Sequence, residues 1–267
     1  MAAASPPAET SSITNAFALS VGALFLAGVL VGLLLPYPQL AQDDRDDELP
    51  ALGLDPTDDP YAPHIDPASF VENVTNPYFP LIPGTTFRFG GTTSAGHEEG
   101  VMVVLAEHKM ILGVSCTIVR DRLSVDGSLV EETLDWYAQD ADGTVWYMGE
   151  DSKEYRNGVV VGTAGSWQAG VGGAQPGVIM FADPLPGVTY RQEYLRGEAE
   201  DMATVLLTDG SVHLAMGDYT HIVQTKDFSL LEPDIIEYKY YAPGLGMILE
   251  DSPGGVERVE LLSVTPG

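Results

Sequence analysis

Short segments separated by Asx-Gly and Gly-Gly pairs restrict the fold of this chain more than any other feature. The pairs are Asp126-Gly127, Asp142-Gly143, Asn157-Gly158 and Asp209-Gly210, with Gly90-Gly91 and Gly254-Gly255 as further candidates. Asp-Gly and Asn-Gly tolerate the positive φ of two-residue hairpin turns, and here β-branched and aromatic residues flank them. This spacing predicts a mainly β fold, a curved antiparallel sheet or barrel of roughly ten or more strands.

Helical signals are weak beyond residue 80. No segment there carries a sustained apolar stripe at the 3.6-residue spacing of an amphipathic helix. The stretch from Glu198 to Leu207 is the one helical candidate.

Residues 16–35 form an uncharged stretch in which Ser20 is the only polar side chain. Twenty helical residues span roughly 30 Å, the thickness of the hydrocarbon core of a bilayer. No Lys or Arg precedes the stretch, so it matches an uncleaved membrane anchor better than a signal peptide. We predict an N-terminal tail and anchor or signal segment over 1–42, with a cleaved signal and a buried soluble helix as alternatives. Gly28 and Gly32 would allow two such helices to pack.

The next segment, residues 43–72, is acidic and rich in Pro, which predicts an extended, self-repelling linker. An antiparallel β domain is expected over 73–267. Because a single N-terminal apolar segment usually serves export, we place this domain outside the cytoplasm, either anchored in the membrane through residues 16–35 or secreted.

The charge balance narrows the function. The chain has 12 Lys and Arg against 39 Asp and Glu, a net charge of -27, and one Cys. Such an acidic surface repels phosphate backbones, so nucleic acid is not an expected partner. One Cys forms no internal disulfide and supplies no zinc cluster.

Two segments alternate so that polar and apolar side chains occupy opposite faces. In 130–139, Val130, Glu132, Leu134, Trp136 and Ala138 are expected in the core. The other face carries Asp135, Tyr137 and Gln139, and the corresponding face of 235–241 carries Glu237, Lys239 and Tyr241. Solvent exposure accounts for both polar faces, and a polar cleft inside a curved sheet is the alternative. In that alternative, these six residues bind a ligand.

Trp167 lies in a Gly-rich segment, residues 162–177, that has no phosphate-binding motif. We expect this tryptophan to plug the end of a barrel, and a mobile cover over a ligand pocket is the alternative.

Glu198, Glu200 and Asp201 form an acidic cluster that offers oxygen ligands to Ca²⁺, and no other cofactor is predicted. The five His residues show no zinc-site spacing, and no Gly-x-Ser-x-Gly nucleophile motif occurs.

Four runs resemble those of a family of uncharacterised exported bacterial β-domain proteins over residues 73 to about 264. They are Asn76–Thr85, Asp135–Asp140, Val145–Glu150 and Tyr240–Gly246. The first and last also resemble periplasmic lipoproteins with half-barrel folds, although a lipid-anchoring Cys is missing. The resemblance implies an exported β domain and no catalytic residues.

These features favour a non-enzymatic β domain that binds an apolar or amphipathic small molecule, or a cell-envelope partner, inside the sheet. This binding hypothesis fails if the folded domain has no cavity of roughly 300 Å³ or more, the lower range for ligand pockets. An enzyme acting on cell-wall or polysaccharide material with two carboxylates is one alternative. A Ca²⁺-stabilised surface protein is the other.

Overall fold

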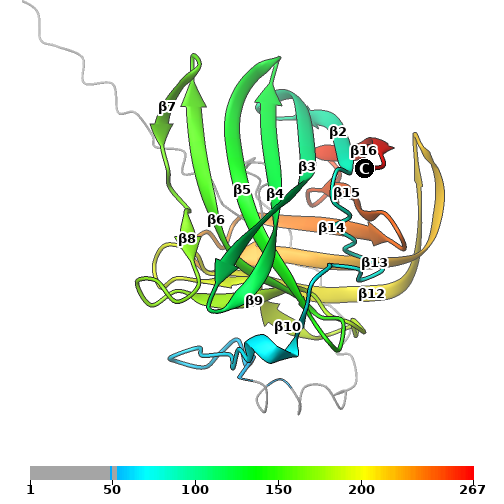
Figure 1. Ribbon diagram of the computed structural model, residues 1–267. Helices are drawn as coiled ribbons and strands as arrows, with labels where there is room; N and C mark the ends of the chain where they lie inside the picture. Colours follow the sequence, from blue (N-terminus) through cyan, green and yellow to red (C-terminus); the bar gives the residue numbers. More distant parts are fainter. Residues whose placement is uncertain (1–48, 50–52) are drawn as a thin grey trace, which may run out of the picture.

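The computed structural model describes Leu49 and residues 53–267 (Figure 1). The predicted anchor over 16–35 lies outside these residues, as do residues 43–48 and 50–52 of the predicted linker. Within the described part, no helix has the length and apolar character needed to cross a membrane.

Strand is the main secondary structure of the described chain, and a short 3-10 helix, η2 (Pro67–Ser69), precedes the sheet. The strands are β1 (Phe70–Val71), β2 (Thr86–Thr93), β3 (Gly96–Ile111), β4 (Val114–Val125), β5 (Ser128–Asp140), β6 (Val145–Arg156), β7 (Val159–Gly162), β8 (Trp167–Gln168), β9 (Gln175–Met180), β10 (Thr189–Arg191), β11 (Glu193–Tyr194), β12 (Asp201–Leu214), β13 (Gly217–Ser229), β14 (Ile236–Ala242), β15 (Gly246–Asp251) and β16 (Arg258–Thr265).

These strands form one antiparallel, nearly closed barrel-like sheet, which confirms the predicted mainly β fold. The order along the sheet is β10-β12-β13-β14-β15-β16-β2-β3-β4-β5-β6-β9-β11. Its two terminal strands, β10 and β11, are consecutive in the chain, so the segment Thr189–Tyr194 pairs with β12 on one side and β9 on the other. In Figure 1, β3 to β6 form one wall and β12 to β14 run across them.

Four of the predicted turn pairs join consecutive strands. Asp142-Gly143 lies between β5 and β6, Gly254-Gly255 lies between β15 and β16, and the other two form two-residue hairpin turns. Asp126 and Gly127 join β4 to β5 with φ of 47° and 76°, and Asn157 and Gly158 join β6 to β7 with 53° and 76°. Positive φ at both central residues gives the turn the twist of the strands that it connects.

Gly90-Gly91 and Asp209-Gly210 are not turns, contrary to the prediction. Gly90 and Gly91 lie within β2, and a Cβ on Gly91 would sit 2.0 Å from the carbonyl oxygen of Arg258. This glycine therefore serves the close approach of β2 and β16. Gly210 lies within β12 at a shift of register, and the chain turns back only after Leu214.

The helix predicted over Glu198 to Leu207 is also wrong. From Asp201 onward this stretch is strand β12, which pairs with β13 along its whole length. Ala, Met and Leu favour helices locally, but pairing with β13 and burial of residues such as Met202 and Val205 override that preference.

The prediction for the two faces of β5 is partly right: Trp136 and Ala138 are buried as expected, but the face that was expected to be polar and exposed is buried as well. Thr133, Asp135 and Tyr137 are buried, whereas Val130 and Leu134 of the expected core face are partly exposed. The inner surface of this barrel is largely polar at the level of these residues, so the solvent-exposed interpretation of the polar face is wrong.

Part of the predicted linker packs against the barrel instead of extending from it. Tyr61 is 1% exposed and makes an edge contact with Tyr194 at 5.6 Å between ring centroids. Arg191 Nε donates a hydrogen bond to the carbonyl oxygen of Pro56, and β1 pairs with β5. The acidic, Pro-rich composition of this segment predicted no packing, but the ring of Tyr61 provides apolar surface that packs against the barrel.

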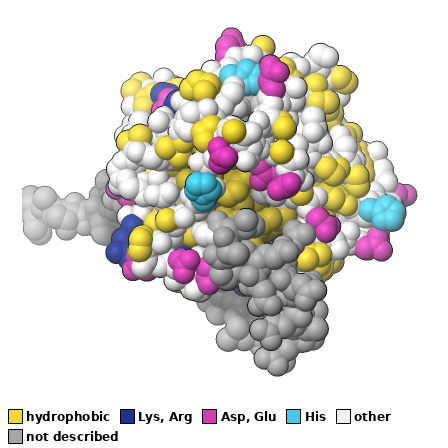
Figure 2. All heavy atoms as spheres, turned by 60° about the horizontal axis from the view of Figure 1, so that its bottom comes forward, with side chains coloured by type: hydrophobic (Ala, Val, Ile, Leu, Met, Phe, Trp, Pro, Cys, Tyr) yellow, Lys and Arg dark blue, Asp and Glu magenta, His cyan; other side chains and the backbone are white. Residues whose placement is uncertain are grey.

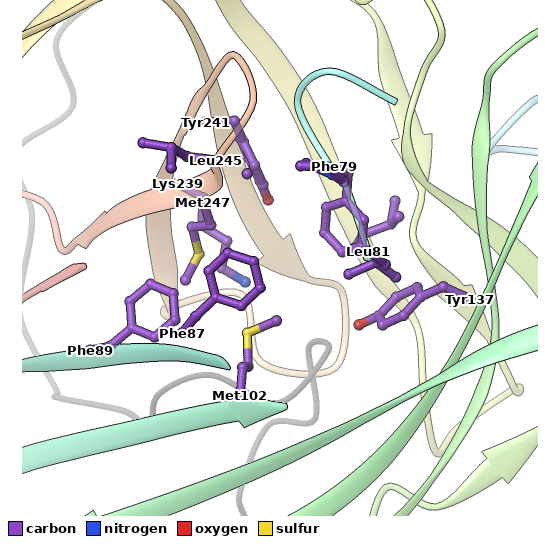
Figure 3. A pocket seen from close by; sticks show the side chains of 13 residues that line it. Phe79, Leu81, Phe87, Phe89, Met102, Tyr137, Lys239, Tyr241, Leu245 and Met247 are labelled. Carbon is purple, nitrogen blue, oxygen red and sulfur yellow. The ribbon is translucent and has the colours of Figure 1, made fainter. Parts of the chain in front are cut away.

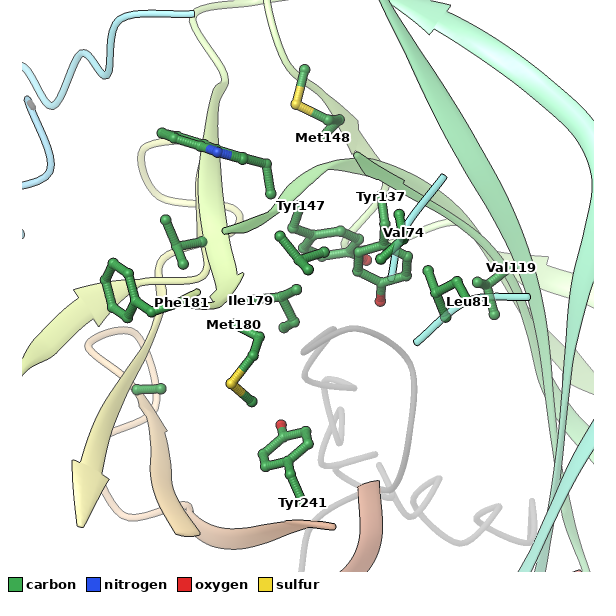
Figure 4. Close-up of a cluster of buried hydrophobic side chains, with 14 of the residues drawn as sticks. Val74, Leu81, Val119, Tyr137, Tyr147, Met148, Ile179, Met180, Phe181 and Tyr241 are labelled. Carbon is green, nitrogen blue, oxygen red and sulfur yellow. The ribbon is translucent and has the colours of Figure 1, made fainter. Parts of the chain in front are cut away.

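An apolar core fills the end of the barrel that the segment before β2 covers (Figure 4). Leu81 from that segment packs with Val119, Tyr137, Tyr147 and Ile179 of the barrel wall. Asn76 anchors the same segment, because its Nδ2 donates to the carbonyl oxygens of Gly143 and Phe181.

Candidate functional site

A small apolar pocket lies between the covering segment and the barrel wall (Figure 3). Its volume is about 50 Å³, below the expected 300 Å³ or more and enough for roughly three to five water molecules. It is lined by Phe79, Pro80, Leu81, Phe87, Phe89, Met102, Tyr137, Ile179, Lys239, Tyr241, Leu245, Gly246 and Met247.

Three of these lining residues, Tyr137, Lys239 and Tyr241, bring polar groups into an otherwise apolar pocket. The two tyrosines and the lysine are 2–4% exposed. Tyr137 and Tyr241 carry their hydroxyls toward the interior from β5 and β14, on opposite sides of the barrel (Figure 3). The pocket is therefore mainly apolar, and we call the polar groups of these three residues its polar floor.

Beneath the floor, the ammonium group of Lys239 is surrounded by carboxylates. Its Nζ lies 3.3 Å from Asp227 Oδ2, 3.6 Å from Glu237 Oε2 and 3.8 Å from Glu250 Oε2. Burial alone would lower the pKa of Lys239, but the attraction of these three acids outweighs burial and raises that pKa. Burial raises the pKa of Glu237 to about 7 although the lysine opposes this shift.

On the opposite wall, Tyr147 links two acids. Its ring stacks on Tyr137 at 4.8 Å between centroids, and its hydroxyl lies 2.7 Å from Asp135 Oδ1 and 2.9 Å from Glu150 Oε2. A phenol has one proton to donate, so one of the two contacts needs a proton on a carboxyl group. Burial, followed by the nearby charge of Asp121, raises the pKa of Asp135 well above its usual range.

Together these acids belong to a set of interior carboxyl groups that we call the acid belt. Its members come from nine strands around the barrel: Glu98, Asp121, Glu131, Asp135, Glu150, Glu193, Asp201, Asp227, Glu237 and Glu250. Neighbouring members raise one another's pKa, as Asp121 does for Asp135 and Glu237 for Glu250. Lys239 is the only basic side chain of Leu49 and residues 53–267 within ion-pair distance of the belt.

Trp167 connects the β6 side of the acid belt to Glu193 of β11. It is 4% exposed, contacts the Tyr147 ring edge-on at 5.3 Å, and donates its indole N–H to Glu193 Oε2 at 2.5 Å. Glu193 in turn interacts with Asp201, whose pKa burial raises to about 6. A buried Trp167 is the arrangement that the plug interpretation predicts.

The structure therefore brings together most of the side chains predicted to bind a ligand. Asp135, Tyr137, Lys239, Tyr241 and Trp167 all lie inside the barrel. Glu237 lies beside Lys239. Gln139 has a structural role instead, because its Oε1 accepts hydrogen bonds from the backbone N–H groups of Thr75 and Asn76.

Five belt members, Glu98, Asp121, Glu193, Asp227 and Glu250, were not singled out in the sequence. Asp121, Glu193 and Asp227 are single acids within their strands, and Glu98 and Glu250 each stand beside a second acid. Nothing in one strand shows that its polar face turns inward. The signal that could have found these acids is a pattern across strands. One strand after another carries acids among apolar residues, as in β4, β5 and β13.

The acids predicted to hold Ca²⁺ are not arranged around a common point. Asp201 is buried in the belt, Glu198 is exposed, and Glu200 accepts a hydrogen bond from the backbone N–H of Gly197 and pairs with Arg191. Among the described residues, no three His, Cys, Asp or Glu side chains are placed to hold a metal ion.

The outer surface is acidic as well. In the face shown in Figure 2, acidic side chains are spread among apolar ones, and basic side chains are few and lie toward one edge. His213 and His221 do not meet across the β12–β13 hairpin but each contacts an aspartate, Asp218 and Asp209 respectively.

Comparison with known proteins leaves the family of the chain open. No family model matches the sequence, and no curated protein does. Among solved structures, one described as a "putative lipoprotein" from Parabacteroides distasonis ATCC 8503 is similar at a TM-score of 0.38 and 10% identity. The likeness covers 73% of this chain and 100% of that chain. The resemblance to exported bacterial β-domain proteins stays a prediction.

Proposed function

We propose that this barrel is a non-enzymatic, exported or membrane-anchored binding domain for a small amphipathic molecule. The observation that carries the proposal is the polar floor of the apolar pocket, formed by Tyr137, Lys239 and Tyr241. An apolar pocket with a few convergent polar groups is the usual form of a small-molecule site. The volume of about 50 Å³ does not meet the roughly 300 Å³ required for a whole small-molecule ligand, so the proposal is restricted to a short chain or the end of a longer one.

Catalysis by a carboxylate pair is less well supported. One pair of acids on neighbouring strands, Asp135 and Glu150, shares the hydroxyl of Tyr147, and both side chains are 1–2% exposed. Neither lines the apolar pocket. Glycoside chemistry requires that substrate and water reach both acids, so binding accounts for this arrangement better.

Titration with a short uncharged amphiphile, n-butanol, tests the pocket in the full-length protein. We expect the methyl NMR signals of Met102 and Met247, which line the pocket, to shift, and that of the exposed Met110 to stay fixed. Met247→Trp fills the pocket and abolishes the shift of Met102, whereas the control Met110→Trp preserves it. Absence of any shift in the wild type, or an equal shift in Met247→Trp, overturns the proposal.

The location outside the cytoplasm rests on the apolar stretch at 16–35 and the resemblance described above. Cell fractionation with an antibody against the β domain tests it. Recovery of the domain in the membrane or exported fraction is the expected result, and recovery in the cytoplasm contradicts it.

A further inference from the structure

Two buried carboxyl groups meet where the sheet closes on itself, at residues 189–194, which we call the closing segment. Glu193 lies in β11 and Asp201 begins β12, and they are 1% and 2% exposed. A hydrogen bond joins the two side chains. Since an ionised carboxylate has no donor, this bond needs a proton on one of them. No other donor of the described residues reaches Glu193 Oε1 or Asp201 Oδ2.

The surroundings of the pair favour the proton on Glu193. Burial raises the pKa of Asp201 to about 6, and the charge of Lys239 opposes a larger rise. Burial, followed by the charges of Asp201 and Glu150, raises the pKa of Glu193 well above its usual range, which the indole N–H of Trp167 offsets only in part. A neutral Glu193 accepts from Trp167 through Oε2 and donates to Asp201, so it satisfies both neighbours.

Ionisation of Glu193 adds a negative charge where acids already predominate. On one side, Glu193 interacts with Tyr147 and Glu150 of β6. On the other side, Asp201 interacts with Lys239. Three further acids share that lysine: Asp227, Glu237 and Glu250. A charged Glu193 is therefore not neutralised inside the barrel and is stabilised by reaching water.

The closing segment is held by few backbone pairs, and its own cation, Arg191, pairs with Glu200 rather than with Glu193. β10 pairs with β12 over three residues, and β11 pairs with β9 over two, one of them with Pro176, which has no backbone N–H. The exposed turn 196–198 begins three residues after Glu193. Separation of β11 from β9 therefore brings the Glu193 carboxyl group to water and leaves the long hairpins intact.

We propose that the proton between Glu193 and Asp201 is a latch that keeps the barrel closed, and that loss of this proton opens the barrel at the closing segment. The stabilisation of the closed form is present in full below the ordinary carboxyl pKa near 4 and is lost as the pH rises through the raised value. The barrel therefore closes in acid and opens toward alkaline pH. As an entrance to the pocket the latch rests on the proposed function, whereas the opening itself does not.

Amide hydrogen exchange of the full-length protein at pH 6 and 9, corrected for the intrinsic effect of pH on exchange, tests the latch. Between these values we expect the protection of residues 189–194 to fall at least about tenfold relative to that of β13, the effect of one unit of pKa difference. The same relative protection at both pH values overturns the proposal.

The Glu193→Gln variant makes the latch permanently neutral, because its amide can accept from Trp167 and donate to Asp201. The closing segment of this variant should be equally protected at both pH values. Glu198→Gln changes an exposed acid in the adjacent turn, is the matched control and should open as the wild type does. An unchanged pH dependence in folded Glu193→Gln overturns the assignment.

If Glu193→Gln does not fold, the NMR signals of the Trp167 indole ring in the wild type decide, since this indole donates to Glu193. They should move with the same midpoint as the loss of protection in residues 189–194, and signals that stay fixed overturn the latch. The n-butanol titration distinguishes the two proposals. Opening with pH but no binding of n-butanol retains the latch and overturns the pocket, and the reverse result retains the pocket alone.

Discussion

Lys239 Nζ lies 3.3 Å from Asp227 Oδ2, and both side chains are at least 95% buried, so a complete ion pair sits inside the barrel. Glu237 and Glu250 extend it to a cluster of one lysine and three acids. All three acids lie at ion-pair distance from Lys239, so this lysine should matter most for the stability of this side of the acid belt.

Replacing the lysine should destabilise the domain strongly. Lys239→Met keeps the volume and removes the charge, which leaves buried acids without a cation. Breaking a buried pair in this way costs about 3–5 kcal/mol of unfolding free energy. Urea unfolding at pH 7 measures the loss. Lys153→Met, which removes a half-exposed pair with Asp151, is the control and should cost less than about 1 kcal/mol. A smaller loss in Lys239→Met than in this control contradicts the prediction.

Stability should fall as the pH rises from 5 to 8. Burial raises the folded-state pKa of Asp201 to about 6 and of Glu237 to about 7, so the folded protein binds more protons than the unfolded chain in this range. The contribution is present in full below the ordinary carboxyl pKa near 4 and is lost as the pH passes through the raised values.

The acidic surface pushes stability in the same direction, so a variant must isolate the interior effect. Glu237→Gln should flatten the curve by on the order of 1–3 kcal/mol between pH 4 and 8. Glu99→Gln changes an exposed acid beside the buried Glu98 and should leave the slope nearly unchanged. Chemical unfolding at several pH values gives both slopes, and equal slopes in the two variants would rule out the interior effect.

The indole of Trp167 should matter for its hydrogen bond as well as for its ring. Trp167→Phe keeps an aromatic ring but removes the donor to Glu193, at a cost of about 1–3 kcal/mol. Trp146→Phe removes a similar bond to Asp140, which is only partly buried, so water replaces the donor and the cost is smaller. Thermal melts monitored by circular dichroism compare the two, and the reverse ranking contradicts the expectation.

Two adjacent glycines in β2 should respond very differently to an added methyl group. In Gly91→Ala the new Cβ would meet the carbonyl oxygen of Arg258 at 2.0 Å, so backbone must move. In Gly90→Ala it meets the flexible end of the exposed Leu262 side chain. We expect a loss of about 3 kcal/mol or more for Gly91 and less than about 1 kcal/mol for Gly90. Similar melting temperatures for the two variants would show that β2 and β16 lie farther apart.

The sequence predicts the class of fold because turn chemistry is local. Asp126-Gly127 and Asn157-Gly158 need only their own positive φ to mark a turn. Gly90-Gly91 and Asp209-Gly210 mislead because a glycine also serves the close approach of two strands or a shift of register. Whether a glycine marks a turn, a close approach of two strands or a shift of register depends on a strand that is distant in the sequence.

The site was harder to predict because the inward direction of a strand is a property of the whole barrel. Alternation in 130–139 correctly separates Asp135 and Tyr137 from Trp136, but apolar residues were expected inside. The acid belt is assembled from nine strands, and the sequence of any one strand shows only the acids of that strand. The pairing of β5 with β4 and β6 brings the acids of these three strands together.

The barrel is closed along a seam that is shorter than most of the other strand junctions. Only three residues in β10 and two in β11 join the two edges of the sheet, whereas β12 and β13 run beside each other for more than ten residues. A guest too large for the present pocket would enter by unzipping this seam while the long hairpins stay intact, since the least paired segments open first. The amides of residues 189–194 should then exchange with solvent ahead of those in β12, which would make these five paired residues the first part of the sheet to open.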